Sequence, residues 1–103
     1  MENNILYELN IEGNTRKLYK GYYKHFKDKL YYVHDIAEHT ETGEIMVFYQ
    51  AMYGERKRYV REISMFLSKT DKEKYPEVTQ EYRFIRFFPE DLKKIWWGVN
   101  IKK

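Results

Sequence analysis

Tyr59 and Arg61 are the residues of this sequence best suited to hold a ligand. Residues two apart on a β-strand share a face, so the ring and the guanidinium would stand side by side while Val60 points into the core. A flat ring beside a planar guanidinium can stack on a nucleobase or hold a phosphate. The alternative is structural: Tyr59 packs under a loop, and Arg61 pairs with Glu41 or Glu62.

Further aromatic and basic residues could extend this surface. Tyr53 occupies the turn before the strand that carries Tyr59, and His25 and Lys27 belong to an aromatic, basic stretch near the N-terminus. Small β-domains often bind nucleic acid through a positive groove lined with stacking rings. The predicted binding site consists of Tyr59, Arg61, His25, Lys27, His39 and Tyr53.

The histidines are the remaining candidates for chemistry. His25 and His39 could bind zinc together with Glu41 or Asp35, although no His-x-x-His pair occurs and such histidines more often hydrogen-bond a turn. His39 and Glu41 share a strand face and could form an acid–base pair. The chain has no cysteine, no Gly-x-Ser-x-Gly elbow and no phosphate-binding glycine loop. The sequence therefore favours a non-catalytic protein without a metal or cofactor.

Charge is segregated along the chain. Residues 14–34 contain six lysines and arginines against one aspartate, residues 35–55 contain five carboxylates and no lysine or arginine, and residues 56–61 add four basic side chains. If the strands that carry the two basic blocks are neighbours, they form a positive patch that attracts nucleic acid or a small anionic, nucleotide-like ligand. The opposing interpretation is an ordinary solvated surface of both signs, because the net charge is only +3.

Length and composition predict one domain over residues 1–103. The chain is 43% hydrophobic and 34% charged, which is typical of a globular protein rather than a disordered one. No apolar run approaches the roughly 20 residues that a membrane helix needs, so we expect no membrane partner. The N-terminus lacks the basic start and apolar block of a secretory signal, and with the absence of cysteine this favours the cytoplasm.

Alternating apolar residues and turn signals predict a mainly β fold. The expected strands cover residues 5–11, 18–26 with a bend at Gly21, 30–39 with a bulge near Asp35, 45–52, 57–63 and 82–87. Both faces of 45–52 are apolar, so this strand should be central. Residues 64–67 should form one helical turn, 68–80 a charged linker, and 89–97 a short helix that opens at Pro89. The expected architecture is a small SH3-like barrel or a strongly twisted antiparallel sheet with a short C-terminal helix.

The two tryptophans fall within the expected C-terminal helix. Trp96 belongs to its apolar stripe, and neighbours on a helix differ in direction by ~100°, so Trp97 lies on a flank. An exposed tryptophan is a candidate for protein contact. The alternative function is therefore a protein–protein interaction module or a small inhibitor of the kind that mobile elements encode.

Several short motifs occur together between residues 21 and 84. They read Gly-Tyr-Tyr-Lys-His-Phe-Lys (21–27), Tyr-Tyr-Val (31–33), Ile-Ala-Glu-His-Thr-Glu (36–41), Val-Phe-Tyr-Gln-Ala-Met-Tyr-Gly (47–54), Tyr-Val-Arg (59–61), Met-Phe-Leu (65–67), Asp-Lys-Glu-Lys-Tyr-Pro (71–76) and Gln-Glu-Tyr-Arg-Phe (80–84). In these motifs the chain resembles the uncharacterised bacterial domain-of-unknown-function family 1653. The resemblance implies no known activity, cofactor or catalytic residue. The family commonly has tryptophan where this chain has Tyr59, and the strand at 5–11 and the helix at 89–97 are additions to it.

Overall fold

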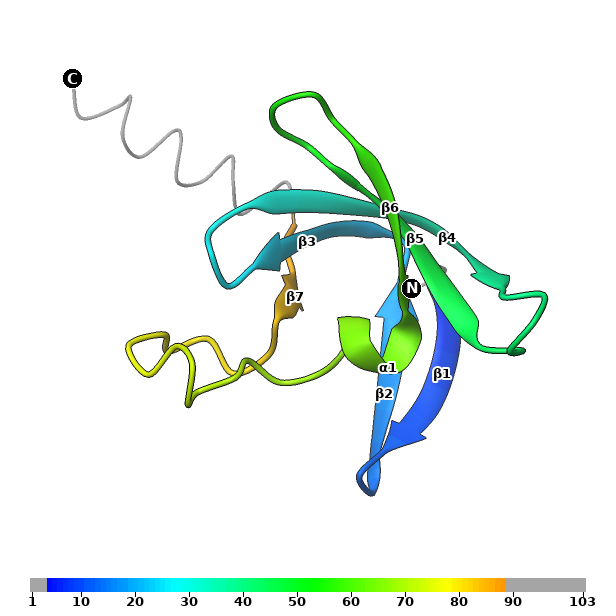
Figure 1. Cartoon of the computed structure of the whole chain (residues 1–103), viewed down its shortest axis with the longest axis horizontal. Helices are drawn as coiled ribbons and strands as arrows, with labels where there is room; N and C mark the ends of the chain where they lie inside the picture. The colour runs from blue at the N-terminus through cyan, green and yellow to red at the C-terminus, as the bar shows by residue number, and fades with distance from the viewer. Residues whose placement is uncertain (1–3, 89–103) are drawn as a thin grey trace.

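The computed structural model describes residues 4–88, which form seven strands and one helical turn. The elements are β1 (Ile5–Ile11), β2 (Asn14–Tyr19), β3 (Gly21–His25), β4 (Leu30–Glu38), β5 (Ile45–Ala51), β6 (Arg58–Glu62), α1 (Ile63–Phe66) and β7 (Phe84–Arg86). β1 and β2 form a two-stranded hairpin, and the other strands form one antiparallel sheet in the order β6-β5-β4-β3-β7. Figure 1 shows α1 and the hairpin on the same side of this sheet. No helix within the described residues is long and apolar enough to cross a membrane.

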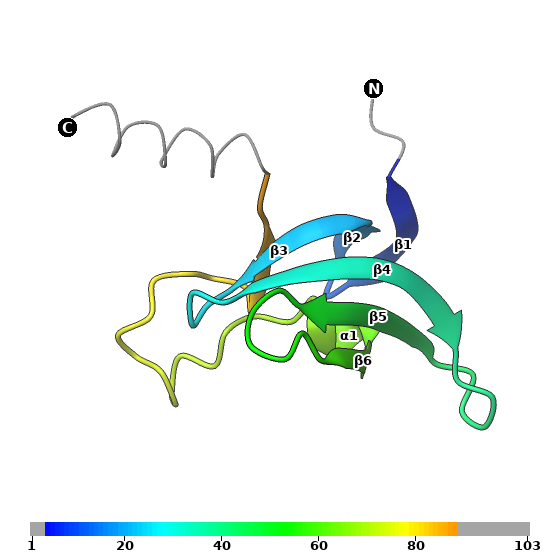
Figure 2. The same ribbon diagram turned by 90° about the horizontal axis from the view of Figure 1, so that it is seen from above.

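The five-stranded sheet is strongly curled (Figure 2). β7 and β5 are separated in the sheet by β3 and β4, which at ~4.8 Å per strand would place them roughly 14 Å apart in a flat sheet. The rings of Phe84 on β7 and Tyr49 on β5 are nevertheless only 5.7 Å apart. The face that carries these two rings is therefore concave.

Local sequence explains how the strands begin and end. β4 contains a register shift between Val33 and Asp35, at the position where the alternation of apolar residues breaks. Gly43 closes the β4–β5 hairpin with φ +76°, a left-handed conformation that glycine adopts without strain. Val47, Tyr49 and Ala51 alternate along β5 and are buried on the concave face. β5 has a hydrogen-bonded neighbour on each side, which confirms the predicted interior position.

The core lies between the concave face and α1. Phe66 of α1 is fully buried, stacks on Phe84 with ring centroids 4.1 Å apart, and contacts Tyr23 and Tyr49 edge-on. Leu18 brings β2 into the same cluster, and apolar residues of β1 pack against it. The helix and the hairpin thus cover one part of the concave face and leave the part near the β3–β4 turn uncovered.

Three expectations about the fold are corrected here. Among residues 4–88 the sheet is not closed into a barrel, because its edge strands β6 and β7 are not paired with each other; the expectation of a twisted antiparallel sheet holds. Val60 does not enter the core, because it lies on the convex face of an edge strand and is 63% exposed. The basic strands β3 and β6 are not neighbours, since β4 and β5 lie between them. The helix expected at 89–97 lies outside the described residues.

Candidate functional site

Four tyrosines lie side by side at the uncovered end of the concave face, three around the buried ring of Tyr49, and we call them the tyrosine surface: Tyr31, Tyr49, Tyr53 and Tyr59. Strand register places Tyr59 of β6 opposite Tyr49 of β5, with ring centroids 5.7 Å apart. Tyr31 of β4 lies 5.6 Å from Tyr49 on its other side. Tyr49 is buried, whereas Tyr59 is 42% exposed. The surface therefore has a fixed ring as its floor and an accessible ring at its edge.

The hydroxyl groups of Tyr31 and Tyr53 are hydrogen-bonded to each other. Their rings meet edge-on with centroids 5.5 Å apart, and Tyr53 is 38% exposed. Burial of Tyr31, and then its hydrogen bond with Tyr53, raise the pKa of the Tyr31 hydroxyl above its ordinary value. The Tyr31 hydroxyl therefore stays protonated at neutral pH, so no phenolate charge on this residue opposes the approach of an anion.

Arg61 extends over this surface from β6. Its Nε–H donates a hydrogen bond to the Tyr49 hydroxyl oxygen at 3.3 Å. No ion pair within 4.0 Å joins Arg61 to a carboxylate in the described part of the chain, and the Glu62 carboxylate instead accepts a hydrogen bond from Ser64 Oγ. The guanidinium therefore keeps hydrogen-bond donors for another acceptor.

His25 closes the site at the end of β3. Its ring contacts Phe84 and Tyr31, with centroids 4.9 and 6.1 Å away. Its Nδ1 accepts a hydrogen bond from the backbone N–H of Lys27 at 3.1 Å, so the neutral ring carries its proton on Nε2. Burial, followed by the positive charges of Lys27, Arg83 and Arg61, lowers the pKa of His25 to about 4. The histidine is thus neutral at physiological pH.

This lowered pKa predicts how stability depends on pH. In the unfolded chain His25 titrates near its ordinary value of ~6.5, so between pH 6.5 and 4 the unfolded state binds the proton more readily and acid destabilises the fold. We expect the free energy of unfolding, measured by urea titration, to fall from pH 7 to pH 4.5. The decrease should be smaller in His25→Asn, whose amide oxygen can accept the Lys27 N–H. Equal decreases in both proteins would contradict the assignment.

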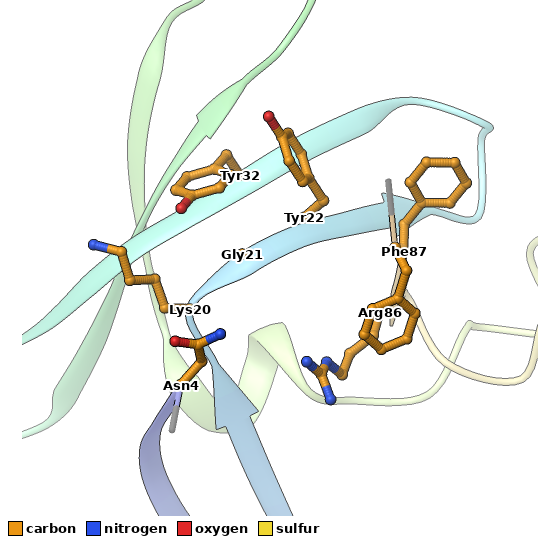
Figure 3. Close-up of a pocket in the computed structure, with 8 residues that line it drawn as sticks. Asn4, Lys20, Gly21, Tyr22, Tyr32, Arg86 and Phe87 are labelled. Atoms are coloured by element: carbon orange, nitrogen blue, oxygen red, sulfur yellow. The ribbon is translucent and has the colours of Figure 1, made fainter. Parts of the chain in front are cut away.

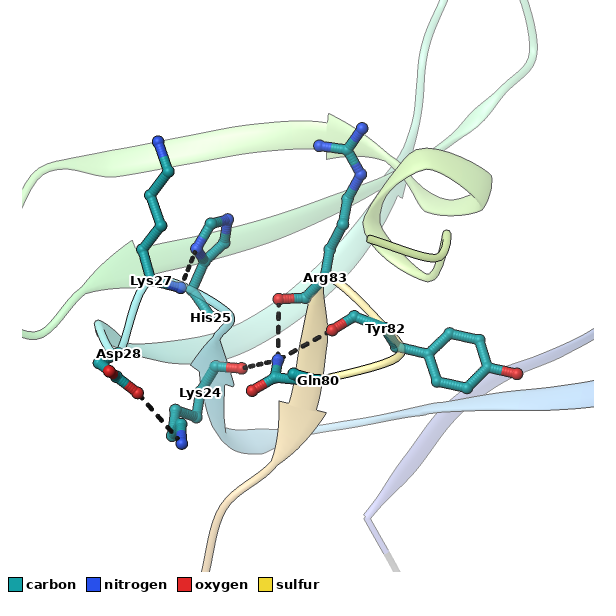
Figure 4. A network of polar contacts seen from close by, with 7 residues as sticks. All are labelled: Lys24, His25, Lys27, Asp28, Gln80, Tyr82 and Arg83. Atoms are coloured by element: carbon teal, nitrogen blue, oxygen red, sulfur yellow. Dashed lines mark hydrogen bonds and ion pairs between the residues drawn. The ribbon is translucent and has the colours of Figure 1, made fainter. Parts of the chain in front are cut away.

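Arg83 is the third cationic side chain of the site, after Arg61 and Lys27, and it comes from the segment that precedes β7. Gln80 Nε2 donates to the carbonyl oxygens of Tyr82 at 2.8 Å and of Lys24 and Arg83 at 3.3 Å, which ties this segment to β3 (Figure 4). The Phe26 N–H also donates to the Arg83 carbonyl oxygen at 3.0 Å. Figure 4 shows the side chains of Lys27, His25 and Arg83 extending to the same side of the backbone.

Five of the six predicted binding residues therefore gather around one end of the concave face: Tyr53, Tyr59, Arg61, His25 and Lys27. His39 does not join them, because it follows the far end of β4, roughly 25 Å along the strand from Tyr31 at ~3.3 Å per residue. Its Nδ1 accepts hydrogen bonds from the backbone of Glu41 and Thr42, so it shapes the β4–β5 hairpin.

Two further hypotheses depend on His39: a zinc site shared with His25 and an acid–base pair with Glu41. A zinc site shared by His25 and His39 is wrong, because these residues belong to opposite ends of the sheet. No group of three or more metal-ligating side chains occurs among residues 4–88. As for the acid–base pair, the backbone N–H groups of Glu41 and Thr42 donate hydrogen bonds to His39 Nδ1, and these bonds stabilise the β4–β5 turn. Trp97, the candidate protein contact, lies outside the described residues.

A second pocket, of about 330 Å³, lies around the bend between β2 and β3 (Figure 3). Tyr22 and Tyr32 meet edge-on there, with ring centroids 4.8 Å apart. Lys20 and Arg86 also line it, and Arg86 stacks on Tyr19 with its guanidinium carbon 3.6 Å from the ring centroid. None of the predicted binding residues lines this pocket, so substitutions in it can serve as controls for substitutions in the tyrosine surface.

Sequence reasoning missed several residues of the site. Tyr31 and Tyr49 were assigned only to strands, although their shared face with Tyr59 follows from the strand register. Arg83, Lys74 and Tyr75 belong to segments read as a charged linker and a last strand, and they line a pocket together with His25 and Lys27. Within the linker, the sequence Lys-Tyr-Pro at 74–76 places a cation next to an aromatic ring. This was the one sequence signal that could have marked the linker as part of a binding site.

Comparison with known proteins places the chain among proteins whose function is not described. The sequence model of a family described as "protein of unknown function (DUF1653)" matches residues 21–88. A crystal structure of a DUF1653 protein from Bordetella bronchiseptica is similar, with 24% sequence identity and a TM-score of 0.57. The alignment covers 68% of this chain and 87% of that chain. No curated protein matches. The matched region spans β3 to β7 and thus contains the whole five-stranded sheet and the candidate site.

Proposed function

The chain belongs to the DUF1653 family, and we propose that it is a non-catalytic binding module for single-stranded nucleic acid or a nucleotide-like ligand. A base stacks on the tyrosine surface, and the neighbouring cations hold the phosphate. The observation that carries this proposal is the exposed ring of Tyr59 beside an Arg61 that forms no ion pair with a described carboxylate. A cytoplasmic location, where such ligands occur, is part of the proposal.

Stacking suits the geometry of the site. Every nucleobase has a flat π-face, and stacking on an aromatic side chain contributes about 1–3 kcal/mol per base with little sequence preference. Tyr59 lies at the rim of the concave face, on edge strand β6, so a base can approach it from solvent. Bases in a duplex are already stacked on each other, which favours a single strand or a mononucleotide as the ligand.

The charges around the tyrosine surface support an anionic ligand. Burial is the main cause of the lowered pKa of His25, and the charges of Lys27, Arg83 and Arg61 lower it further. These cations come from the β3–β4 turn, from the segment before β7 and from β6. In the sheet β6 is not a neighbour of β3 or β7, and the curl of the sheet brings the charges together. Binding through such cations releases counterions from the nucleic acid and therefore weakens as salt increases.

Fluorescence anisotropy tests the proposal directly. The full chain is titrated into labelled single-stranded and duplex oligonucleotides, and into a fluorescent mononucleotide, at about 50 and 200 mM salt. We expect binding of the single strand or the mononucleotide, with weaker binding at the higher salt concentration. Absence of binding to all three probes at low salt would overturn the proposal and leave a protein–protein interaction module as the function to pursue.

The exposed ring of Tyr59 should contribute directly to binding of a base. We expect Tyr59→Ala to weaken binding of a single-stranded oligonucleotide by about 10-fold, within the range for loss of one stacking interaction. The matched control is Tyr22→Ala, which removes a ring of the same size from the opposite face. Weaker binding in Tyr22→Ala with unchanged binding in Tyr59→Ala would move the ligand to the pocket of Figure 3.

A further inference from the structure

We propose that the pocket between the β3–β4 turn and the segment 71–83 binds the phosphate group of the ligand. The inference rests on the proposed function, because it assigns the anionic part of that ligand a place of its own. The pocket has a volume of about 180 Å³ and adjoins the tyrosine surface through His25. Lys27, Lys74 and Arg83 supply its positive charge.

Two of these cations gather at one aromatic ring. The ammonium groups of Lys27 and Lys74 lie 5.2 and 5.6 Å from the centroid of Tyr75. Attraction to the ring face compensates part of the cost of holding like charges together. Neither lysine forms an ion pair within 4.0 Å with a carboxylate among residues 4–88. Both ammonium groups can therefore donate hydrogen bonds to a phosphate.

Arg83 is fixed by its surroundings. Its Nε–H donates to Ser68 Oγ at 2.8 Å, and its backbone N–H donates to the Ser68 carbonyl oxygen at 3.0 Å. The Nε–H contact occupies one edge of the guanidinium and leaves its terminal nitrogens for a ligand, while the backbone contact fixes the position of the residue. A guanidinium held in this way offers a planar pair of donors to phosphate oxygens with little loss of side-chain freedom.

Asp71 is the one carboxylate of the pocket, and its charge is engaged by the backbone. Its Oδ1 accepts hydrogen bonds from the N–H groups of Glu73 at 3.1 Å and Lys74 at 3.2 Å. Those contacts build the turn that presents Lys74 and Tyr75 to the pocket. Three cations against one carboxylate leave the pocket net positive.

His25 contributes a neutral donor and a measurable signal. Because Nδ1 accepts the Lys27 N–H, Nε2 carries the proton and can donate to a phosphate oxygen. A bound phosphate offsets the charges that act on His25 from Lys27, Arg83 and Arg61, so the imidazolium form is stabilised. The pKa of His25 should therefore rise when the pocket is filled.

NMR titration of the histidine side chains tests this inference on the full chain. We expect the pKa of His25 to rise by roughly one unit or more with inorganic phosphate or adenosine monophosphate, and not with adenosine. His39, in the distant β4–β5 hairpin, provides a reference signal in the same spectrum. Lys74→Gln should abolish the shift, whereas Lys17→Gln removes the same charge from β2, which does not line the pocket, and should leave it unchanged.

The outcomes separate this inference from the proposed function. If inorganic phosphate shifts His25 in both the wild type and Tyr59→Ala, the pocket is an anion site whether or not bases stack. If an oligonucleotide binds the wild type but the pKa of His25 does not move, or moves equally in Lys74→Gln, the pocket assignment is wrong while the proposed function stands. If no probe binds, both are wrong.

Discussion

Replacing Phe66 with alanine is expected to lower the free energy of unfolding by about 3–5 kcal/mol, the range for truncation of a fully buried aromatic ring. Phe66 is the one described helical residue that touches the rings of Tyr23, Tyr49 and Phe84 together. These rings belong to β3, β5 and β7, so the alanine variant leaves a cavity where three strands converge. Urea denaturation followed by fluorescence measures the loss.

Met65→Ala provides the matched control for this prediction. Met65 precedes Phe66 in the same helical turn but is 45% exposed, so its truncation should change the free energy of unfolding by no more than about 0.5 kcal/mol. A loss below about 1 kcal/mol for Phe66→Ala would show that α1 is not what holds the concave face together. It would also remove the reason for the fixed position of Tyr49 within the tyrosine surface.

Local signals predicted most strands of the fold. Alternation identified β1, β4 and β5, the broken alternation near Asp35 identified the bulge, and Gly21 marked the bend between β2 and β3. These features depend on residues close together in the chain, where side-chain period and turn chemistry act directly. The family resemblance at 21–84 was confirmed and extends four residues further, to 88.

Long-range pairing could not be predicted in the same way. β7 adds to β3, about sixty residues earlier in the chain, and no local pattern specifies that partner. The curl of the sheet follows from this arrangement and from packing on Phe66, which explains why a charged linker became the wall of a pocket. The same limit explains the error at Val60, because alternation shows which residues share a face but not which face is covered.

For the candidate site, too, local features were predicted from the sequence and long-range ones were not. The shared face of Tyr59 and Arg61 follows from their spacing on one strand, and the structure has them opposite Tyr49 and Val47 of β5. The approach of His25 to this pair depends on the curl, which brings β3 and β6 toward each other across two intervening strands. His39 was placed wrongly because its distance from His25 depends on the length of β4 and not on its residue type.

Reversing the charge of Arg61 is expected to have the largest effect on ligand binding. A hydrogen bond to a charged group contributes about 1.5–3 kcal/mol, which corresponds to roughly 10–150-fold in affinity, and the introduced carboxylate adds repulsion. We therefore expect Arg61→Glu to weaken oligonucleotide binding by at least about 30-fold at 50 mM salt in the anisotropy titration. The pKa of His25 should also rise in this variant, because one of the charges that lowers it is reversed.

Arg58→Glu separates a local effect of Arg61 from an effect of net charge. Arg58 and Arg61 lie on the same edge strand, but Arg58 pairs with Gln50 and belongs to the convex face, whereas Arg61 pairs with Val47 and belongs to the concave face. Both substitutions change the net charge equally, so long-range attraction of a polyanion should weaken equally in the two variants. If the concave face holds the ligand, Arg61→Glu loses far more affinity than Arg58→Glu, and equal losses would mean that the tyrosine surface is not where the ligand binds.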